Sequence, residues 1–270
     1  MSSLWPVPPG GPAEDELYAL KERRAVRLPP SFLDRRPSVP PWKLFLCMDW
    51  LFAIAVDLCL QEETFALACG LFTRALATRR EVPLPRLQLC AAVCLAVASK
   101  LLEVDSPTLG HVAVECTHGA AEPPQYMGRD AVVEEREVLA SLNHNLLVPT
   151  PYDFLVRFKR FADCERAYEL ARYACLSCCF SLPCYALPPS HVAAACFAVG
   201  VRQAGDRWTE DMQRLAPNPR ALRRVVAHVD AAAASGVFPE LKAHFDALLH
   251  ASDVAMQPRT PAPANRKRKV

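Results

Sequence analysis

The chain has 270 residues, 31 of them basic and 29 acidic, so its formal net charge at neutral pH is only +2. This balance gives no general electrostatic attraction for nucleic acid or anionic lipid, and we expect a protein partner with neither nucleic acid nor membrane bound. The length exceeds that of a typical domain of ~100 to 150 residues and favours two medium-sized domains.

Most of the twelve cysteines lie inside apolar stretches. The N-terminus lacks the basic start and apolar core of a signal peptide, so we interpret the thiols as reduced in an intracellular protein. Cys175 and Cys178 form a C-x-x-C pair, but no second pair or nearby histidine completes a zinc set. We therefore expect structural cysteines and no metal.

Helical patterns dominate the first half of the chain. A short amphipathic segment and a proline-punctuated linker lead into long apolar segments. The most apolar one has no formally charged residue between Arg86 and Lys100. A helix that is apolar on every side belongs at the centre of a domain, and this one is too short to span a membrane. The expected helices cover residues 14–26, 42–60, 62–77, 86–103, 107–116 and 130–142.

After residues 148–154 the pattern recurs, again with an Ala- and Cys-rich central segment. Expected helices here cover residues 151–162, 165–181, 189–204, 208–214 and 218–234. Without any convincing period-two strand pattern, the sequence predicts an all-α chain with two tandem five-helix folds, an N-terminal helix and disordered termini. The predicted units are 1–41 (tail, short helix and linker), 42–147 (first fold), 148–252 (second fold) and 253–270 (disordered tail).

Five segments, in order and with preserved spacing, resemble the cyclins, which consist of two five-helix cyclin folds. The third, fourth and fifth are similar to the D-type, G1-phase group, and the Ala, Pro and Arg bias is similar to that of the cyclins of gammaherpesviruses. The segments are CMDWL (47–51), LQEETFALA (60–68), RLQLCAAVCLAVASK (86–100), TPYDFLVRF (150–158) and PPSHVAAACF (188–197).

By this resemblance, Lys100 and Glu135 match the lysine and glutamate with which cyclins contact a kinase. The pair would hold the αC helix of a protein kinase inward, as catalysis by the kinase requires. Without the resemblance, Lys100 would reach solvent and Glu135 would belong to an exposed run at 134–137. The packing residues implied around the pair are Val97, Leu101, Glu103, Leu139 and His144.

A second implied site is the patch that binds RxL segments of substrates and inhibitors. Lys43 stands where the family usually has methionine, and Cys47 where it has leucine, which makes the pocket shallower. The alternative is that these apolar residues belong to the core. The docking residues are Leu46, Cys47, Trp50 and Gln88.

The chain departs from the family pattern in several places. It lacks the LxCxE motif of D-type cyclins, and the buried Arg and Asp of the first two helices fall on Leu44 and Thr73. Loss of both charges together can be neutral, which favours a folded, divergent cyclin. The basic end reads as a nuclear import signal, and Thr260 is a candidate phosphosite before Pro261. The import residues are Arg266, Lys267, Arg268 and Lys269.

The resemblance implies a non-catalytic subunit without cofactor, and no phosphate loop, HExxH or GxSxG motif is present. We expect it to bind and activate a G1-class cyclin-dependent kinase, of the type numbered four and six, and to direct the kinase to retinoblastoma-type substrates. The expected location is the nucleus, which is the host nucleus if the chain is viral, and also the cytoplasm. Kinase inhibitor proteins are further expected partners. The alternatives are a scaffold or inhibitor that binds a kinase unproductively, and a transcription factor similar to general initiation factors, which would need a basic surface for DNA.

Overall fold

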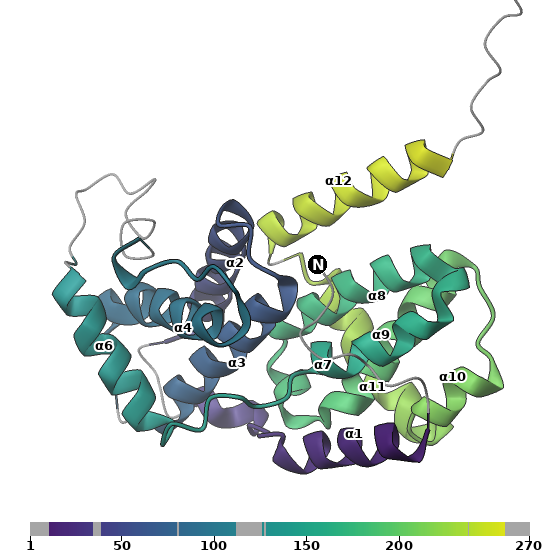
Figure 1. Ribbon diagram of the computed structural model, residues 1–270, viewed down its shortest axis with the longest axis horizontal. Coiled ribbons are helices and arrows are strands. Elements are labelled where there is room, and N and C mark those ends of the chain that lie inside the picture. Colours follow the sequence, from purple (N-terminus) through teal and green to yellow (C-terminus); the bar gives the residue numbers. More distant parts are fainter. Residues whose placement is uncertain are drawn as a thin grey trace, which may run out of the picture.

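The computed structural model describes residues 11–34, 39–79, 81–111, 126, 128–236 and 238–256. All regular elements within these ranges are helical, and they form two bundles side by side (Figure 1). The predicted all-α class is confirmed. The termini beyond these ranges, with Thr260 and the four import residues, lie outside the described residues.

The first bundle is built around its most apolar helix, as predicted. Of the 16 residues of α4 (Leu87–Leu102), 12 are buried. The segment Leu84–Leu102 is apolar and long enough to cross a membrane by composition alone, but 67% of its most apolar window is buried inside the protein. Its apolar character is therefore explained by the core. Around it lie α2 (Pro41–Asp57), α3 (Glu62–Thr78), the 3₁₀ turn η2 (Leu84–Arg86) and α6 (Gly128–Ser141).

The short helix expected at 107–116 falls partly outside the described residues. Of its residues, 107–111 are described, and 109–111 are helical while 107 and 108 are not.

The second bundle has α9 (Pro189–Ala204) as its central helix, again as the Ala- and Cys-rich pattern predicted. Gly200 allows α9 to approach α8 closely, because a Cβ at this position would lie 2.1 Å from the Ala167 carbonyl oxygen. The other elements are α7 (Pro151–Leu155), η3 (Val156–Cys164), α8 (Glu165–Ser177), η4 (Cys178–Phe180), η5 (Leu182–Ala186), α10 (Glu210–Leu215) and α11 (Pro219–Ala234).

Two expected helices of this bundle are interrupted. The helix expected at 151–162 tightens into the 3₁₀ segment η3, and Phe161 leaves helical geometry with φ −92° and ψ 39°. The ring of Phe161 lies 6.3 Å from that of Phe158 and 6.2 Å from that of Phe197, so aromatic packing accompanies the break. The helix expected at 165–181 ends as an α-helix at Ser177.

The helix α12 (Pro239–Met256) was not predicted from the sequence. Its first turn is held by Asp49 of α2, which is buried and accepts hydrogen bonds from the Glu240 and Leu241 amides at 3.1 and 3.2 Å. These are the amides that a helix leaves unpaired at its N-terminus. Phe245 of α12 belongs to the core cluster of the first bundle, which also includes Leu176 of α8, and its ring lies 5.5 Å from that of Tyr173 of α8. The helix α12 therefore packs where the two bundles meet.

The N-terminal helix α1 (Pro12–Arg24) makes the reverse crossing. It precedes the first bundle, yet Tyr18 belongs to the core of the second. The carboxylate of Glu14 is buried and pairs with Arg157, at 3.2 Å, and with Arg160. The helix predicted here is confirmed, but its amphipathic character is not, because the residues that it buries are Glu14 and Tyr18 while Leu17 and Leu20 are exposed.

Leu44 and Thr73, where the cyclin pattern has a charged pair, are both fully buried. The Thr73 hydroxyl donates to the Cys69 and Gly70 carbonyl oxygens, at 2.9 and 3.1 Å. No buried charge is left behind at either position. This agrees with the prediction that joint replacement leaves a folded chain.

Candidate protein-binding site

Lys100 and Glu135 form an ion pair at the surface of the first bundle. Lys100 lies in the last turn of α4 and Glu135 in the middle of α6, and the Lys100 Nζ is 2.6 Å from the Glu135 Oε1. Their side chains are 44% and 18% exposed. The structure thus brings together the two residues that the sequence resemblance singled out, and it leaves both within reach of a partner.

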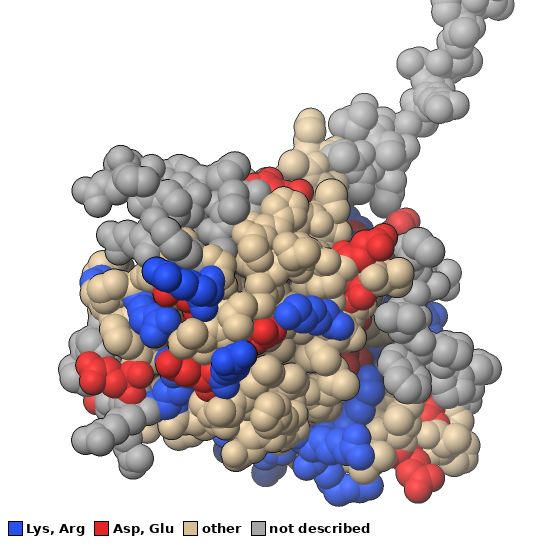
Figure 2. Space-filling model, turned by 60° about the vertical axis from the view of Figure 1, so that its left-hand side comes forward, with Lys and Arg blue, Asp and Glu red and all other residues tan. Residues whose placement is uncertain are grey.

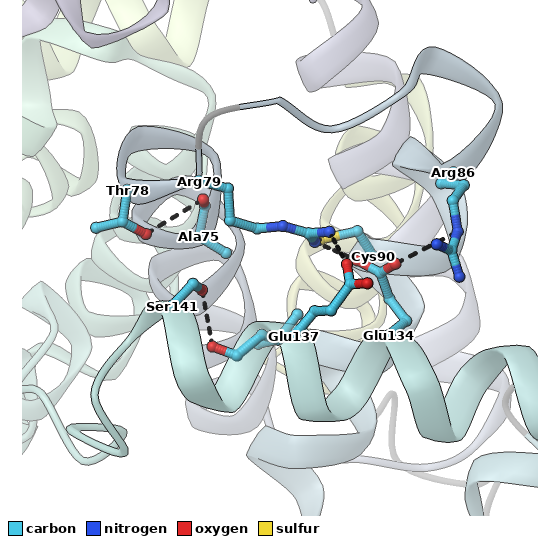
Figure 3. A network of polar contacts seen from close by, with 9 residues as sticks. Ala75, Thr78, Arg79, Arg86, Cys90, Glu134, Glu137 and Ser141 are labelled. Carbon is cyan, nitrogen blue, oxygen red and sulfur yellow. Dashed lines mark hydrogen bonds and ion pairs between the residues drawn. The ribbon is translucent and has the colours of Figure 1, made fainter.

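The acidic run around Glu135 is not a uniformly exposed surface. Glu134 is completely buried and pairs with Arg79, while its Oε2 faces the Arg86 Nε at 3.6 Å (Figure 3). Glu137, one turn further along α6, is exposed and also pairs with Arg79. The interpretation of residues 134–137 as a solvated run is therefore wrong for Glu134, since helical geometry turns it inward.

Glu103 is used within the protein. Its Oε1 accepts hydrogen bonds from the Gln61 amide at 2.8 Å and from the Thr64 hydroxyl at 2.5 Å, at the N-terminus of α3. A carboxylate there satisfies a free amide and is favoured by the helix dipole. The geometry assigns Glu103 a structural part beside the site.

The other predicted packing residues differ in exposure. Val97 is buried, Leu139 is partly buried against the core, and Leu101 and His144 are exposed. His144 has a positive φ of 55°, as does its neighbour Asn143 at 50°, where the chain turns sharply after α6. This turn brings His144 to the surface.

A hollow lies beside Leu101 and His144. It is also lined by Arg24 at the end of α1 and by the linker between the bundles, in which Leu147 is 64% exposed. Sequence reasoning missed Arg24 and Leu147, because they join the surface only through the docking of α1 and the path of the linker. The lining residues are Arg24, Leu101, His144, Asn145, Leu146 and Leu147.

The predicted docking residues lie along α2 and the start of α4. Leu46 is 61% exposed, so it is not a core residue, whereas Cys47, Trp50 and Gln88 are partly buried. Trp50 packs against Ala92 and Ala96 of α4, and Gln88 lies one helical turn before Ala92. The four residues therefore lie along the two helices whose packed faces meet at Trp50.

Beside this patch, Lys43 carries a positive charge, whereas Cys47 is uncharged. Burial raises the pKa of the Cys47 thiol to about 11, although the neighbouring Lys43 lowers it, so the thiol is neutral at physiological pH. The Lys43 Nζ lies 5.2 Å from the centre of the Trp42 ring, a cation–π contact on an exposed tryptophan. Sequence reasoning did not single out Trp42, although an exposed tryptophan is uncommon on a soluble surface.

Seven of the ten cysteines whose burial the structure describes are buried, while Cys47 and Cys179 are partly buried and Cys59 is exposed. Cys175 and Cys178 are reduced and buried, and the Cys178 Sγ lies 3.8 Å from the Cys196 Sγ. Within the described ranges, no three His, Cys, Asp or Glu side chains come together in a group able to hold a metal ion.

Comparison with known proteins shows the family to which this chain belongs. A family model described as "Cyclin, N-terminal domain" matches residues 15–147, and one described as "Cyclin, C-terminal domain" matches residues 149–243. A viral cyclin from herpesvirus saimiri has a similar structure, with a TM-score of 0.63 and 17% identity over 74% of this chain and 87% of that one. The fold is therefore that of two cyclin boxes, and the chain belongs to the cyclin family.

Curated relatives are distant. Cyclin-B2-4 of Arabidopsis thaliana is 23% identical over 203 residues, which is 74% of this chain and 45% of that protein. A G2/mitotic-specific cyclin-B of Emericella nidulans is 34% identical over 143 residues, 52% of this chain and 28% of that protein. The chain thus spans less than half the length of these relatives, and their names are those of B-type cyclins.

Proposed function

We propose that this chain is a non-catalytic regulatory subunit that binds a cyclin-dependent kinase through the surface around Lys100 and Glu135. The observation that carries the proposal is the exposed ion pair at 2.6 Å, positioned by two packed helices of a cyclin box. The bound surface would hold the kinase αC helix inward, so that its glutamate can pair with the lysine that positions the nucleotide phosphates.

The pair has bonding capacity left for a partner. An ammonium has three donors, and a carboxylate has about four acceptor positions, of which the ion pair occupies one of each. Lys100 can donate to backbone carbonyl groups of the kinase and Glu135 can accept from its amides, each such charge-assisted bond contributing ~1.5 to 3 kcal/mol. Burial of the exposed Leu101 and Leu147 would add an apolar contribution.

For the kinase, we propose the G1 class, with retinoblastoma-type proteins as substrates and a gammaherpesvirus-like origin of the chain. The support is the similarity of residues 86–100, 150–158 and 188–197 to the D-type group. A mitotic kinase is the second candidate, because curated relatives carry the names of G2/mitotic cyclins. Substrates and inhibitors with RxL segments would dock at Leu46, Cys47, Trp50 and Gln88.

Surface charge favours a protein partner over DNA. On the face shown in Figure 2, Lys and Arg side chains lie among Asp and Glu side chains over much of the surface and gather at its lower edge, with broad uncharged areas between the charged groups. A transcription factor of the same fold would need a continuous basic surface.

We propose that the complex works in the nucleus and also occurs in the cytoplasm, with Arg266, Lys267, Arg268 and Lys269 as the import signal. Alanine at these four positions is expected to leave a fluorescent fusion mainly cytoplasmic.

The test is binding to, and activation of, purified G1 and mitotic kinases, with a retinoblastoma-protein fragment as substrate. Lys100→Glu and Glu135→Lys are each expected to lower kinase affinity by at least about tenfold, the equivalent of one charge-assisted bond. Lys242→Glu, a charge reversal at an exposed lysine of α12, is the matched control and should bind as the unchanged chain does.

The combined variant Lys100→Glu with Glu135→Lys separates two explanations. It restores an ion pair inside the cyclin but presents each charge to the wrong kinase group, so it is expected to remain defective. Recovered binding would mean that the pair serves only the fold. Binding of the unchanged chain without activation would favour the scaffold or inhibitor, and the absence of binding to every kinase would contradict the proposal.

A further inference from the structure

The anchoring of α6 is unusual, because only three of its side chains are buried, and one of them is a carboxylate. These are Ala131, Glu134 and Val138, whereas Val132 and Val133 are exposed. Alanine and valine bury little surface, and Glu134 is the longest of the three inward side chains. Leu139 is partly buried against the core as well, so Glu134 is the charged member of the set of side chains that anchor α6.

Glu134 is held from two directions. Arg79, immediately after α3, donates to one carboxylate oxygen, and Arg86, immediately before α4, faces the other at 3.6 Å (Figure 3). The carboxylate thus ties α6 to both ends of the connection between α3 and α4. A fully buried carboxylate is costly without partners, so it resists any rotation of α6 that would separate it from these arginines.

The next residue along α6 is Glu135. Successive residues in a helix are about 100° apart, so Glu134 pointing inward directs Glu135 to the side, toward the end of α4. A rotation of α6 by about 20° would move a side-chain end by about 2 Å, given a helix radius of 5 to 6 Å. Such a displacement is enough to break the 2.6 Å contact between Glu135 and Lys100.

We propose that Glu134, clasped by Arg79 and Arg86, is a positioning residue that sets the rotation of α6 and thereby places the Glu135 carboxylate beside Lys100. This inference rests on the proposed function, because Glu135 matters only if a kinase binds there. Glu134 touches no partner itself and acts through Glu135. Glu134 thus orients the helix from inside the protein, and Glu135 contacts the partner at its surface.

The first experiment needs no kinase. The acylation rate of Lys100 by an N-hydroxysuccinimide ester is measured by peptide mass spectrometry, with Lys242 of the same molecule as the reference. Glu135→Ala removes the partner of Lys100 and defines the fastest rate. Glu134→Gln is expected to raise the Lys100 rate most of the way to that limit. An unchanged Lys100 rate in a folded Glu134→Gln variant would overturn the proposal.

Two further variants guard against a general loss of folding. Arg86→Gln removes only the contact to the second oxygen of Glu134, at a side chain that is 29% exposed, and is expected to raise the Lys100 rate by a smaller amount. Glu137→Gln is the matched control, because Glu137 shares the partner Arg79 and the helix α6 but is exposed. Its Lys100 rate should equal that of the unchanged chain, and a rise as large as that of Glu134→Gln would contradict a specific part for Glu134.

The second experiment is a double-mutant cycle for kinase affinity. Glu134→Gln is expected to weaken binding by about tenfold when Glu135 is present, which corresponds to loss of one charge-assisted bond. In the Glu135→Ala background it should change binding by less than about twofold, because the group that it positions is gone. Equal losses in both backgrounds would assign Glu134 to the fold in general. If the unchanged chain binds no kinase, the proposed function fails while the labelling result still decides the positioning.

Discussion

At the scale of single residues, the first bundle has its buried charges in an unusual place. The positions of the usual arginine and aspartate are Leu44 and Thr73, both fully buried and uncharged, whereas Glu134 and Arg79 form a buried ion pair between α6 and the end of α3. An ion pair in a core fixes orientation more than it stabilises, because desolvation offsets its attraction. Asp49 remains a buried charge on α2, where it caps α12, and Glu134 is a buried charge on α6, the helix that carries Glu135.

Leu44→Arg tests whether the core around α2 still has a place for a charge. We expect it to reduce the free energy of unfolding by at least about 3 kcal/mol, because the guanidinium would be buried without a partner. Leu46→Arg, two residues further along the same helix at an exposed position, should change it by no more than about 0.5 kcal/mol. Both are measured by urea unfolding, and a tolerated Leu44→Arg would mean that a partner other than Thr73 remains nearby.

At the scale of elements, each bundle depends on one central helix. In α4 the neighbours are accommodated by Ala and Cys side chains, and in α9 the closest approach requires Gly200, where a Cβ would also lie 2.9 Å from the Ala171 amide nitrogen. Gly70 of α3 is different, because a Cβ there would meet no atom within 4 Å. The close packing of α8 and α9 therefore requires glycine at position 200, whereas the packing around α3 leaves room for a side chain at position 70.

Substitution of the two glycines by alanine should give opposite results. Gly200→Ala is expected to lower the free energy of unfolding by about 1 to 3 kcal/mol, because α8 and α9 must separate to admit the methyl group. Gly70→Ala should raise it by about 0.5 to 1 kcal/mol, since alanine restricts the unfolded chain and adds no clash. Thermal unfolding of both variants measures the difference, and a stabilised Gly200→Ala would contradict the close packing of the second bundle.

At the scale of the whole molecule, the two bundles are bound together by helices from outside them. The N-terminal helix α1 packs on the second bundle, and α12 packs on both α2, with Asp49 at its N-terminus, and α8. Glu62 of α3 also pairs with Arg172 of α8 at 2.5 Å. These crossings favour unfolding of the chain as one cooperative unit, and they place Arg24 of α1 beside the proposed kinase surface.

Glu14 and Asp15 test the docking of α1. Glu14→Gln is expected to lower the free energy of unfolding by about 3 kcal/mol, because two arginines of the second bundle lose a buried partner. Asp15→Asn should lower it by less than about 1 kcal/mol, because Asp15 also pairs with Arg157 but is 71% exposed. Urea unfolding and limited proteolysis after Arg24 provide the measurements. Similar effects of the two variants would show that contacts other than the Glu14 ion pairs, such as those of Tyr18, hold α1.

The sequence by itself determined the helices of the two bundles and their central members, because an apolar surface with helical period must be buried wherever it lies. The pattern around α12 was present too, with Pro239 at the helix start and Leu241, Phe245 and Leu248 at helical spacing, and could have been recognised. The pairing of Lys100 with Glu135 came from the family resemblance, since periodicity alone left both at the surface.

Only the tertiary structure decided which charges are buried. Glu134 and Glu135 are adjacent identical residues, and one is enclosed by arginines while the other reaches the surface, because the rotation of α6 is set by its contacts with α3 and α4. In the same way, Glu103 caps the start of α3 by accepting from the Gln61 amide, although the two residues are 42 positions apart in the sequence. Asp49 caps α12 by accepting from the Glu240 amide, 191 positions further along the chain. Such partners are joined by folding of the whole chain, and no local pattern specifies them.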